Sequence, residues 1–134
     1  MQVFLGRFSE VAFTLMRIVL AFLYWSHGPR WLFGAFGAPA PAEPWSMFFV
    51  AGLIETSFGI LIALGLFTSY AAFIASGEMA VAYYIAHVPR GGWIPIENGG
   101  EITVALCFAF LYLATRGGGT FSLDHWIESR RRKS

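Results

Sequence analysis

Residues 45–66 read WSMFFVAGLIETSFGILIALGL, an apolar stretch with a single ionisable side chain, Glu55. A helix needs about 20 mainly apolar residues to cross the hydrocarbon core of a bilayer, so this stretch is long enough to span one. A charged group near the bilayer centre costs roughly 2.5–3.5 kcal/mol on insertion scales. Glu55 is therefore expected to face other polar groups, water or a ligand rather than lipid.

Three further segments have the same character. The chain of 134 residues is 57% hydrophobic and only 13% charged, whereas soluble domains have about 25% charged residues. Each predicted span contains or begins with a charged residue, namely Arg17, Glu55, Glu78 and Glu101. The sequence therefore predicts one all-α domain over residues 1–134, an integral membrane four-helix bundle of two helical hairpins. The predicted spans are about 8–27, 45–66, 68–86 and 100–115, of which the fourth is short.

The distribution of basic residues predicts the orientation of the bundle. Arg7 precedes the first span, whereas Arg116 and residues 130–133 follow the fourth. The connections after the first and third spans carry only Arg30 and Arg90. The positive-inside rule then places both termini in the cytoplasm. Two N-caps are also predicted, Thr68 for the third span and Ser122 for a short interfacial helix over 122–131.

Composition and motifs exclude several function classes. A net charge of +1 gives no indication of a nucleic-acid partner, and no P-loop or GxGxxG motif indicates a nucleotide. Cys107 is the only cysteine, which excludes an internal disulfide, a CxxC pair or a cysteine-held metal cluster within one chain. If the protein does redox work, the electrons must reside on a bound cofactor or a partner.

A short internal repeat relates the two predicted hairpins. Residues 24–30 and 84–90 both read Tyr-x-x-His-x-Pro-Arg. Each copy is followed by a connection rich in Trp, Pro and Gly and then by a glycine-led helix start with a glutamate, Glu55 or Glu101. The two halves would be related by an axis along the membrane normal. Chance similarity is the alternative, because Pro and His are common at helix ends.

Helical rise suggests where the charged groups lie. At about 1.5 Å per residue, Arg17 is roughly 15 Å below His27, and Glu78 is roughly 13 Å below His87. Glu55 lies on the order of 12–15 Å below the start of its span. We therefore expect an outward-facing polar pocket for a ligand or protons, with its charged floor near mid-membrane. The candidate pocket residues are Arg17, His27, Arg30, Glu55, Glu78, His87, Arg90, Asn98 and Glu101.

Each of these residues also has a structural interpretation. Arg17 can form a register-fixing ion pair with Glu55 or Glu78, and the glutamate left over would be expected to take up a proton, as a proton relay requires. Asn98 and Glu101 have the spacing of a capping box. The two histidines, His27 and His87, can simply finish helices. His27, His87, Glu55 and Glu101 are weak candidates for a metal site, and a haem between the histidines is disfavoured by their place at helix ends.

The motifs together resemble a known family. The relevant stretches are Gly52-Leu53-Ile54-Glu55, His27-Gly28, residues 76–84 (SGEMAVAYY), His87 with Pro89, Asn98-Gly99-Gly100-Glu101, and Ser122-Leu123-Asp124. They resemble the DoxX family of small bacterial membrane proteins, over nearly the whole chain. Many members carry a lysine shortly after the His-Gly pair, whereas this chain has Arg30 and Trp31 in that region.

The resemblance implies a four-helix protein of the bacterial inner membrane. The family name comes from similarity to the membrane subunit of an archaeal thiosulfate:quinone oxidoreductase, and other members are linked to membrane oxidoreductase complexes. The leading hypothesis is a redox subunit that binds a quinone in the polar pocket, receives electrons from a partner oxidoreductase and is not catalytic alone. The alternative is a non-catalytic membrane anchor or a small proton- or solute-conducting protein. A homo-oligomer is compatible with either hypothesis.

Overall fold

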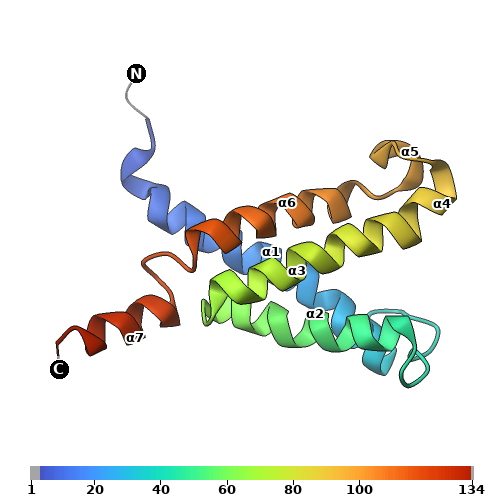
Figure 1. The fold of residues 1–134 in the computed structure, drawn as a ribbon, viewed down its shortest axis with the longest axis horizontal. Coiled ribbons are helices and arrows are strands. Elements are labelled where there is room, and N and C mark those ends of the chain that lie inside the picture. The colour runs from blue at the N-terminus through green and yellow to red at the C-terminus, as the bar shows by residue number, and fades with distance from the viewer. Residues whose placement is uncertain (1–3, 134) are drawn as a thin grey trace.

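The computed structural model describes residues 4–133, and all regular secondary structure in that range is helical (Figure 1). The all-α prediction is thus confirmed. A 3-10 turn at Gly6–Phe8 leads into the first long helix. The elements that follow are α1 (Ser9–Phe33), α2 (Met47–Leu64), α3 (Thr68–Ala82), a π-helical turn (Tyr83–His87), α4 (Val88–Gly91), α5 (Pro95–Asn98), α6 (Glu101–Arg116) and α7 (Leu123–Arg131).

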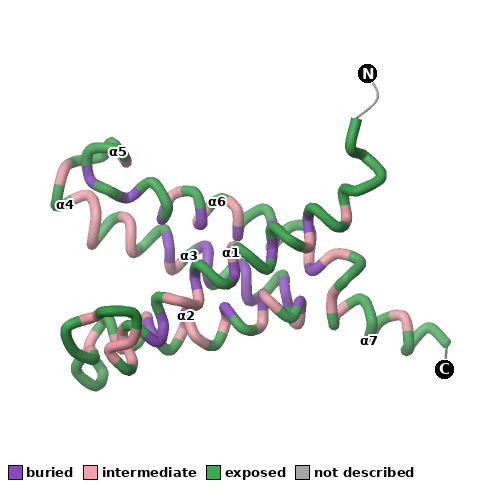
Figure 2. The backbone as a smooth tube through the Cα atoms, turned by 180° about the vertical axis from the view of Figure 1, so that it is seen from behind, coloured by how far each residue is buried: buried purple, intermediate pink, exposed green. Residues whose placement is uncertain are grey.

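Among the described residues, three helical segments are long and apolar enough to cross a membrane. They are Gly6–Phe33, Met47–Leu64 and Thr68–Gly91, the last of which runs through α3, the π-turn and α4. With 16 residues, α6 is shorter than these three. Large apolar side chains are exposed on the outside of the helices, while the buried positions face inward (Figure 2). The fold is therefore that of a membrane protein whose outer surface suits lipid.

The first long helix extends further than the sequence predicted. Instead of ending at His27, α1 continues through Pro29 to Phe33 and stops at Gly34, whose φ of 67° is left-handed. Proline inside a helix removes one hydrogen bond and usually interrupts it. Here Gly28 and Pro29 are both buried in the helix, and a Cβ on Gly28 would overlap Thr56 of α2. Close packing against α2 thus holds this turn helical.

The long helices pack mainly as two pairs, α1 with α2 and α3 with α6, and the pairs meet through α2 and α3 (Figure 1). Glycines bring α1 and α2 together, because a Cβ on Gly59 would lie 2.8 Å from the Cβ of Trp25. An edge-to-face contact between Tyr24 and Phe110, with ring centroids 5.1 Å apart, joins the two pairs in the core. A cleft between the pairs is the natural place for a ligand.

The start of α1 and the helix α7 lie at the same end of the structure, and the connections 34–46 and 92–100 lie at the other (Figure 1). We call these the terminal end and the loop end. At the terminal end the buried guanidinium of Arg17 donates to the carbonyls of Ile62 and Ala63, at 2.7 and 2.6 Å, and to that of Phe121 at 2.7 Å. Arg17 therefore adds a donor to the last carbonyls of α2, of which that of Ile62 also accepts from the Gly65 N–H at 3.1 Å.

The start of α3 is capped from the far end of the chain. The carboxylate of Asp124 accepts hydrogen bonds from the backbone N–H groups of Phe67 and Thr68, at 2.8 and 2.9 Å, and from the Thr68 hydroxyl at 2.8 Å. The prediction of Thr68 as N-cap is wrong, since Thr68 is the first helical residue and Phe67 precedes it. The prediction of Ser122 as N-cap of α7 is confirmed, because its hydroxyl accepts from the His125 N–H at 3.2 Å.

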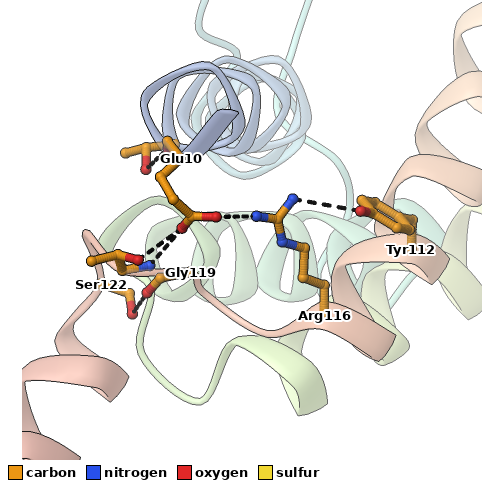
Figure 3. Close-up of polar contacts among 7 residues, drawn as sticks. Glu10, Tyr112, Arg116, Gly119 and Ser122 are labelled. Carbon is orange, nitrogen blue, oxygen red and sulfur yellow. Dashed lines mark hydrogen bonds and ion pairs between the residues drawn. The ribbon is translucent and has the colours of Figure 1, made fainter. Parts of the chain in front are cut away.

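A second polar contact at the terminal end ties α1 to the end of α6 (Figure 3). Glu10 forms an ion pair with Arg116, and its other carboxylate oxygen accepts from the Thr120 N–H and hydroxyl at 3.1 and 2.9 Å. The guanidinium of Arg116 also lies 3.7 Å from the ring centroid of Phe13. The terminal end is thus held by polar contacts between segments distant in sequence.

Candidate functional site

A cavity of about 500 Å³ lies between the two helix pairs and extends toward the loop end. Its lining comes from α1, α2, α3, the π-turn, α4 and α6. Among the predicted pocket residues, the structure brings six to this cavity, namely His27, Arg30, Glu55, Glu78, His87 and Arg90. Their placement gives the cavity an acidic end, an apolar wall and a basic mouth.

The acidic end, which we call the floor, contains the two glutamates. Glu55 on α2 is buried and Glu78 on α3 is partly buried, and their charges are close enough to interact. Behind them, outside the cavity lining, lies the hydroxyl of Tyr24, whose ring is fully buried and which is within electrostatic range of both carboxylates.

Three oxygen atoms at the floor make no hydrogen bond within 3.5 Å to another described residue, although the Tyr24 hydroxyl lies near enough to the Glu78 carboxylate to interact with it. They are the hydroxyl of Tyr24 and one carboxylate oxygen each of Glu55 and Glu78, and we call them the floor oxygens. Buried polar groups in native proteins are almost always paired, so each exception calls for an explanation. Several such atoms from three helices at one end of a cavity indicate a place where a polar ligand group binds.

The wall between floor and mouth is apolar and borders the lipid-facing surface. Its side chains include Val50 and Ile54 of α2, Met79 of α3 and Leu106 of α6. Other lining residues are exposed on the outside of the helices, among them Phe48, Val81 and Ile85. The cavity can therefore be entered sideways from a bilayer, which suits an apolar molecule better than a freely soluble one.

The mouth of the cavity carries Arg30 from α1 and Arg90 from α4, both exposed. His27 lies on the same side, with its Nδ1 2.9 Å from the carbonyl oxygen of Leu23 in the preceding turn. Arg90 and Glu78 thus lie far apart along the cavity, whereas His27 and Arg30 lie near the depth of Glu55, because Gly28 between them packs against Gly52 and Thr56. By helical rise, about 18 Å of helix separates Glu78 from Arg90.

His87 lies on the π-turn and connects it to α6. Its Nδ1 lies 3.3 Å from the carbonyl oxygen of Asn98, and its Nε2 lies 3.2 Å from the hydroxyl of Thr103. A π-turn inside an α-helix is rare and frequently marks a functional site. Because both ring nitrogens have partners, His87 is an oriented wall residue rather than a free ligand.

Asn98 holds the connection between α4 and α6 together. Its amide donates to the Gly92 carbonyl at 2.8 Å and to the Tyr83 hydroxyl at 3.0 Å, and its side-chain oxygen accepts from the Gly100 N–H at 2.8 Å. Tyr83 in turn donates to the Trp93 carbonyl at 2.7 Å. Asn98 therefore supports the mouth from behind without lining the cavity.

Comparisons with known proteins agree with this architecture. The model of the DoxX family matches residues 12–88, which include His27, Glu55, Glu78 and His87. The chain belongs to the DoxX family. It is also 39% identical over 130 residues to an uncharacterized protein of Haemophilus influenzae, and the similarity covers 90% of this chain and 94% of that one. No solved structure matches the chain significantly.

The structure of this DoxX-family protein shows that the predicted position of Arg17 is wrong. Arg17 does not pair with Glu55 or Glu78, because its guanidinium donates to the carbonyls at the terminal end. The depth estimate assumed that the first helix ends at His27. Since α1 ends at Phe33, Arg17 lies about 24 Å from the loop end of its helix, and Tyr24 lies about 14 Å from it. Tyr24 therefore occupies the depth at which Arg17 was expected.

The predicted capping box of Asn98 and Glu101 is also wrong. The N-cap of α6 is Gly100, which makes no side-chain cap, and Asn98 is the last residue of α5. Because Asn98 ends the short helix α5, it is not in position to cap α6. Glu101 is exposed at the start of α6 and does not line the cavity.

Sequence reasoning missed Tyr24 as a neighbour of the floor glutamates. Tyr24 opens the first copy of the internal repeat, which was the available signal. The repeat itself did not identify it, because Tyr84 in the second copy is exposed and packs beside Trp93, whereas Tyr24 is in the core. The histidines and arginines of both copies do line the same cavity.

Within residues 4–133, no three His, Cys, Asp or Glu side chains are grouped closely enough to hold a metal ion. Of the four weak metal candidates, His27, His87 and Glu55 line the cavity, and Glu101 does not.

Proposed function

We propose that this protein crosses the bacterial inner membrane four times, with α6 as the fourth span and both termini in the cytoplasm. The basic residues of the terminal end, Arg7, Arg116 and residues 130–133, support this orientation. The 16 residues of α6 extend about 24 Å, somewhat less than the roughly 30 Å hydrocarbon core. Local thinning of the bilayer accommodates such a difference at modest cost.

The proposed activity is the binding of a quinone-like ring as a subunit of a membrane redox system. The floor oxygens carry this proposal. A buried polar group without a partner costs about 1–3 kcal/mol, so a ligand head that pairs with several of them gains this free energy on binding. The apolar wall and its lateral opening suit the ring and the tail of a membrane quinone.

The separation of floor and mouth decides which groups would hold the ring. The sequence suggested that His27, His87, Arg30 or Arg90 hydrogen-bond the quinone oxygens. A head at the floor is about 18 Å of helix from Arg90, which leaves the hydroxyl of Tyr24 and the carboxyls of Glu55 and Glu78 as its proposed partners. His27 and Arg30, near the depth of Glu55, remain within the same part of the cavity. His27, one turn beyond Tyr24, is the mouth residue nearest to it in the helix.

Reduction of a bound quinone would require sources of protons and electrons. Reduction of a quinone to a quinol takes two electrons and two protons. Glu55 and Glu78 are proposed to pass the protons, as intramembrane acids do in other proton relays. This chain has one cysteine and so no dithiol pair, and the electrons are assigned to a partner oxidoreductase.

A binding experiment tests the proposal. The full-length protein in lipid nanodiscs is titrated with short-tail ubiquinone and menaquinone analogues, and binding is measured by quenching of the Trp31 fluorescence at the cavity wall. We expect saturable binding that weakens about tenfold or more in Glu78→Gln, Glu55→Gln and Tyr24→Phe, since each removes a partner worth about 1.4 kcal/mol or more. His87→Ala, which frees the π-turn from α6, should weaken it as well.

Glu101→Gln is the matched control, because it makes the same chemical change at an exposed position outside the cavity. It should leave the affinity unchanged. If neither quinone class binds, or if Glu101→Gln reduces binding as much as Glu78→Gln, the floor is not a quinone site.

The alternative functions are an anchor and a small proton or solute conductor. The described core between the floor and the terminal end is apolar, with Ile62, Phe110 and Leu113 fully buried. This packing favours a ligand pocket closed at one end over a conducting path. Proton flux in liposomes that contain the purified protein, lowered by Glu55→Gln, would instead support conduction.

A further inference from the structure

The mouth arginines, Arg30 and Arg90, differ from four other arginines of the chain, each of which contacts another part of the protein. Arg17 and Arg116 have hydrogen-bonded partners, while Arg7 and Arg130 lie over aromatic rings. Arg30 and Arg90 come from different helices and line one cavity, yet neither forms a hydrogen bond or ion pair with any residue of 4–133. Two unpaired guanidinium groups at one opening form an anion-attracting mouth.

Acidic residues at the loop end do not neutralise this mouth. Glu43, Glu97 and Glu101 are exposed there, but none lines the cavity. Of the two glutamates that do line it, Glu78 is about 18 Å of helix away from Arg90. Glu55 lies near the depth of Arg30 but forms no ion pair with it. The charge of the mouth is therefore available to a ligand.

Neighbouring aromatic residues indicate the depth of the mouth in a bilayer. Trp31 follows Arg30 directly, and Trp93 follows Arg90 by three residues. Trp45 and Trp93 are largely exposed at the same end. Tryptophan concentrates at the level of lipid headgroups, so the mouth arginines lie at that level too.

The surface below the mouth is apolar and faces outward. Phe48 on α2 and Val81 and Ile85 on the opposite side of the cleft line the cavity while remaining exposed. A cationic rim above an exposed apolar cleft matches a molecule with an anionic head and a hydrocarbon chain.

We propose that the mouth binds one phospholipid with an anionic headgroup from the leaflet at the loop end. Its phosphate lies between Arg30 and Arg90, and one acyl chain lies along the outer part of the cleft. The planar guanidinium group matches phosphate oxygens in a bidentate manner, and two of them favour a head with net negative charge over a zwitterionic one. A lipid, rather than free phosphate, is the occupant because the adjoining surface is exposed hydrocarbon at headgroup depth.

The test counts lipids on the purified full-length chain by native mass spectrometry, with phosphatidylglycerol and phosphatidylcholine of the same chain length. We expect one phosphatidylglycerol to bind about 30-fold more tightly than phosphatidylcholine, at about fivefold for each arginine. Arg30→Gln/Arg90→Gln should remove this preference. Arg30→Lys/Arg90→Lys, which keeps the charge and loses the fork, should retain part of it.

Arg130→Gln/Arg132→Gln is the matched control, since it removes two exposed charges at the terminal end. It should leave the preference for phosphatidylglycerol intact. Tyr24→Phe should leave it intact as well, so a failure of the lipid proposal can be distinguished from a failure of quinone binding. Equal binding of the two lipids to the unmodified chain, or loss of the preference in the control, would overturn the proposal. Displacement of phosphatidylglycerol by millimolar inorganic phosphate would show a free-anion site instead and would also overturn it.

Discussion

Asp124 caps the helix that Thr68 begins, although 56 residues separate them in the chain. One carboxylate oxygen accepts both the N–H and the hydroxyl of Thr68, and the other accepts the N–H of Phe67. An N-cap normally comes from the residue just before the helix. Here Phe67 occupies that position with a left-handed φ of 48°, and its side chain cannot accept a hydrogen bond. The Ser122-Leu123-Asp124 motif therefore caps two helices, α7 through Ser122 and α3 through Asp124.

Removal of the Asp124 carboxylate should destabilise the protein. We expect Asp124→Ala to lower the free energy of unfolding by about 1–2 kcal/mol, as loss of an N-cap does, and Asp124→Asn to have a smaller effect because one acceptor remains. The measurement is an SDS-induced unfolding titration in mixed micelles. Glu128→Ala is the control, since its exposed pair with Arg132 should contribute less than about 1 kcal/mol. Equal effects of the two alanine variants would contradict the capping role.

Arg17 should be among the residues least tolerant of substitution. Arg17→Met removes the side-chain donor to the carbonyls of Ile62, Ala63 and Phe121, of which that of Ile62 keeps another donor, the Gly65 N–H, and we expect a loss of about 3 kcal/mol or more. Arg17→Lys should recover only part of this, because an ammonium group lacks the forked geometry. The same unfolding titration measures both. An effect no larger than that of Arg7→Met, an exposed site, would show that the hydrogen bonds contribute little.

Two glycines on different helices should respond in opposite directions to alanine. A Cβ at Gly59 would lie 2.8 Å from the Cβ of Trp25, so Gly59→Ala should separate α1 from α2 and cost about 1–3 kcal/mol. A Cβ at Gly77 meets nothing within 4 Å, so Gly77→Ala should be neutral or stabilise its helix by up to about 1 kcal/mol. If thermal unfolding shows the same shift for both, close α1–α2 packing is not what requires Gly59.

Tyr24→Phe should weaken ligand binding without a marked loss of stability. The buried Tyr24 hydroxyl makes no hydrogen bond within 3.5 Å and only a longer contact with the Glu78 carboxylate, so its removal should change the free energy of unfolding by no more than about 1 kcal/mol. The same variant should weaken quinone binding. A marked loss of stability would reveal that the hydroxyl has a structural partner.

Cysteine labelling tests the proposed orientation. In a Cys107→Ser background, Ser129→Cys at the terminal end should react with a membrane-impermeant maleimide only after the cells are opened. Ala40→Cys, in the exposed connection between α1 and α2, should react in intact spheroplasts. Reaction of both positions from the same side would rule out the three spans that the proposed topology places between them.

The sequence was sufficient to predict the helices and part of the site. Glu55 and Glu78 could be identified because a carboxylate in an apolar span has few acceptable surroundings. The length of α1 could not be predicted, since Pro29 usually ends a helix and is retained here by packing against α2. That error also displaced Arg17 in the depth estimate.

Tyr24 was missed for a different reason. A hydroxyl in an apolar span is common and carries no signal until its surroundings are known. The capping of α3 by Asp124 likewise could not be predicted from a local sequence pattern, because the cap and the helix meet only in the folded chain.

The placement of residues 121–124 has a consequence for biosynthesis. The Phe121 carbonyl that Arg17 needs and the Asp124 carboxylate that α3 needs are synthesised after all the long helices. The earlier helices thus wait in the translocon or the lipid with incomplete ends, and assembly finishes only when this late segment arrives. A nascent chain stalled before residue 121 should accordingly be a substrate for membrane quality-control proteases.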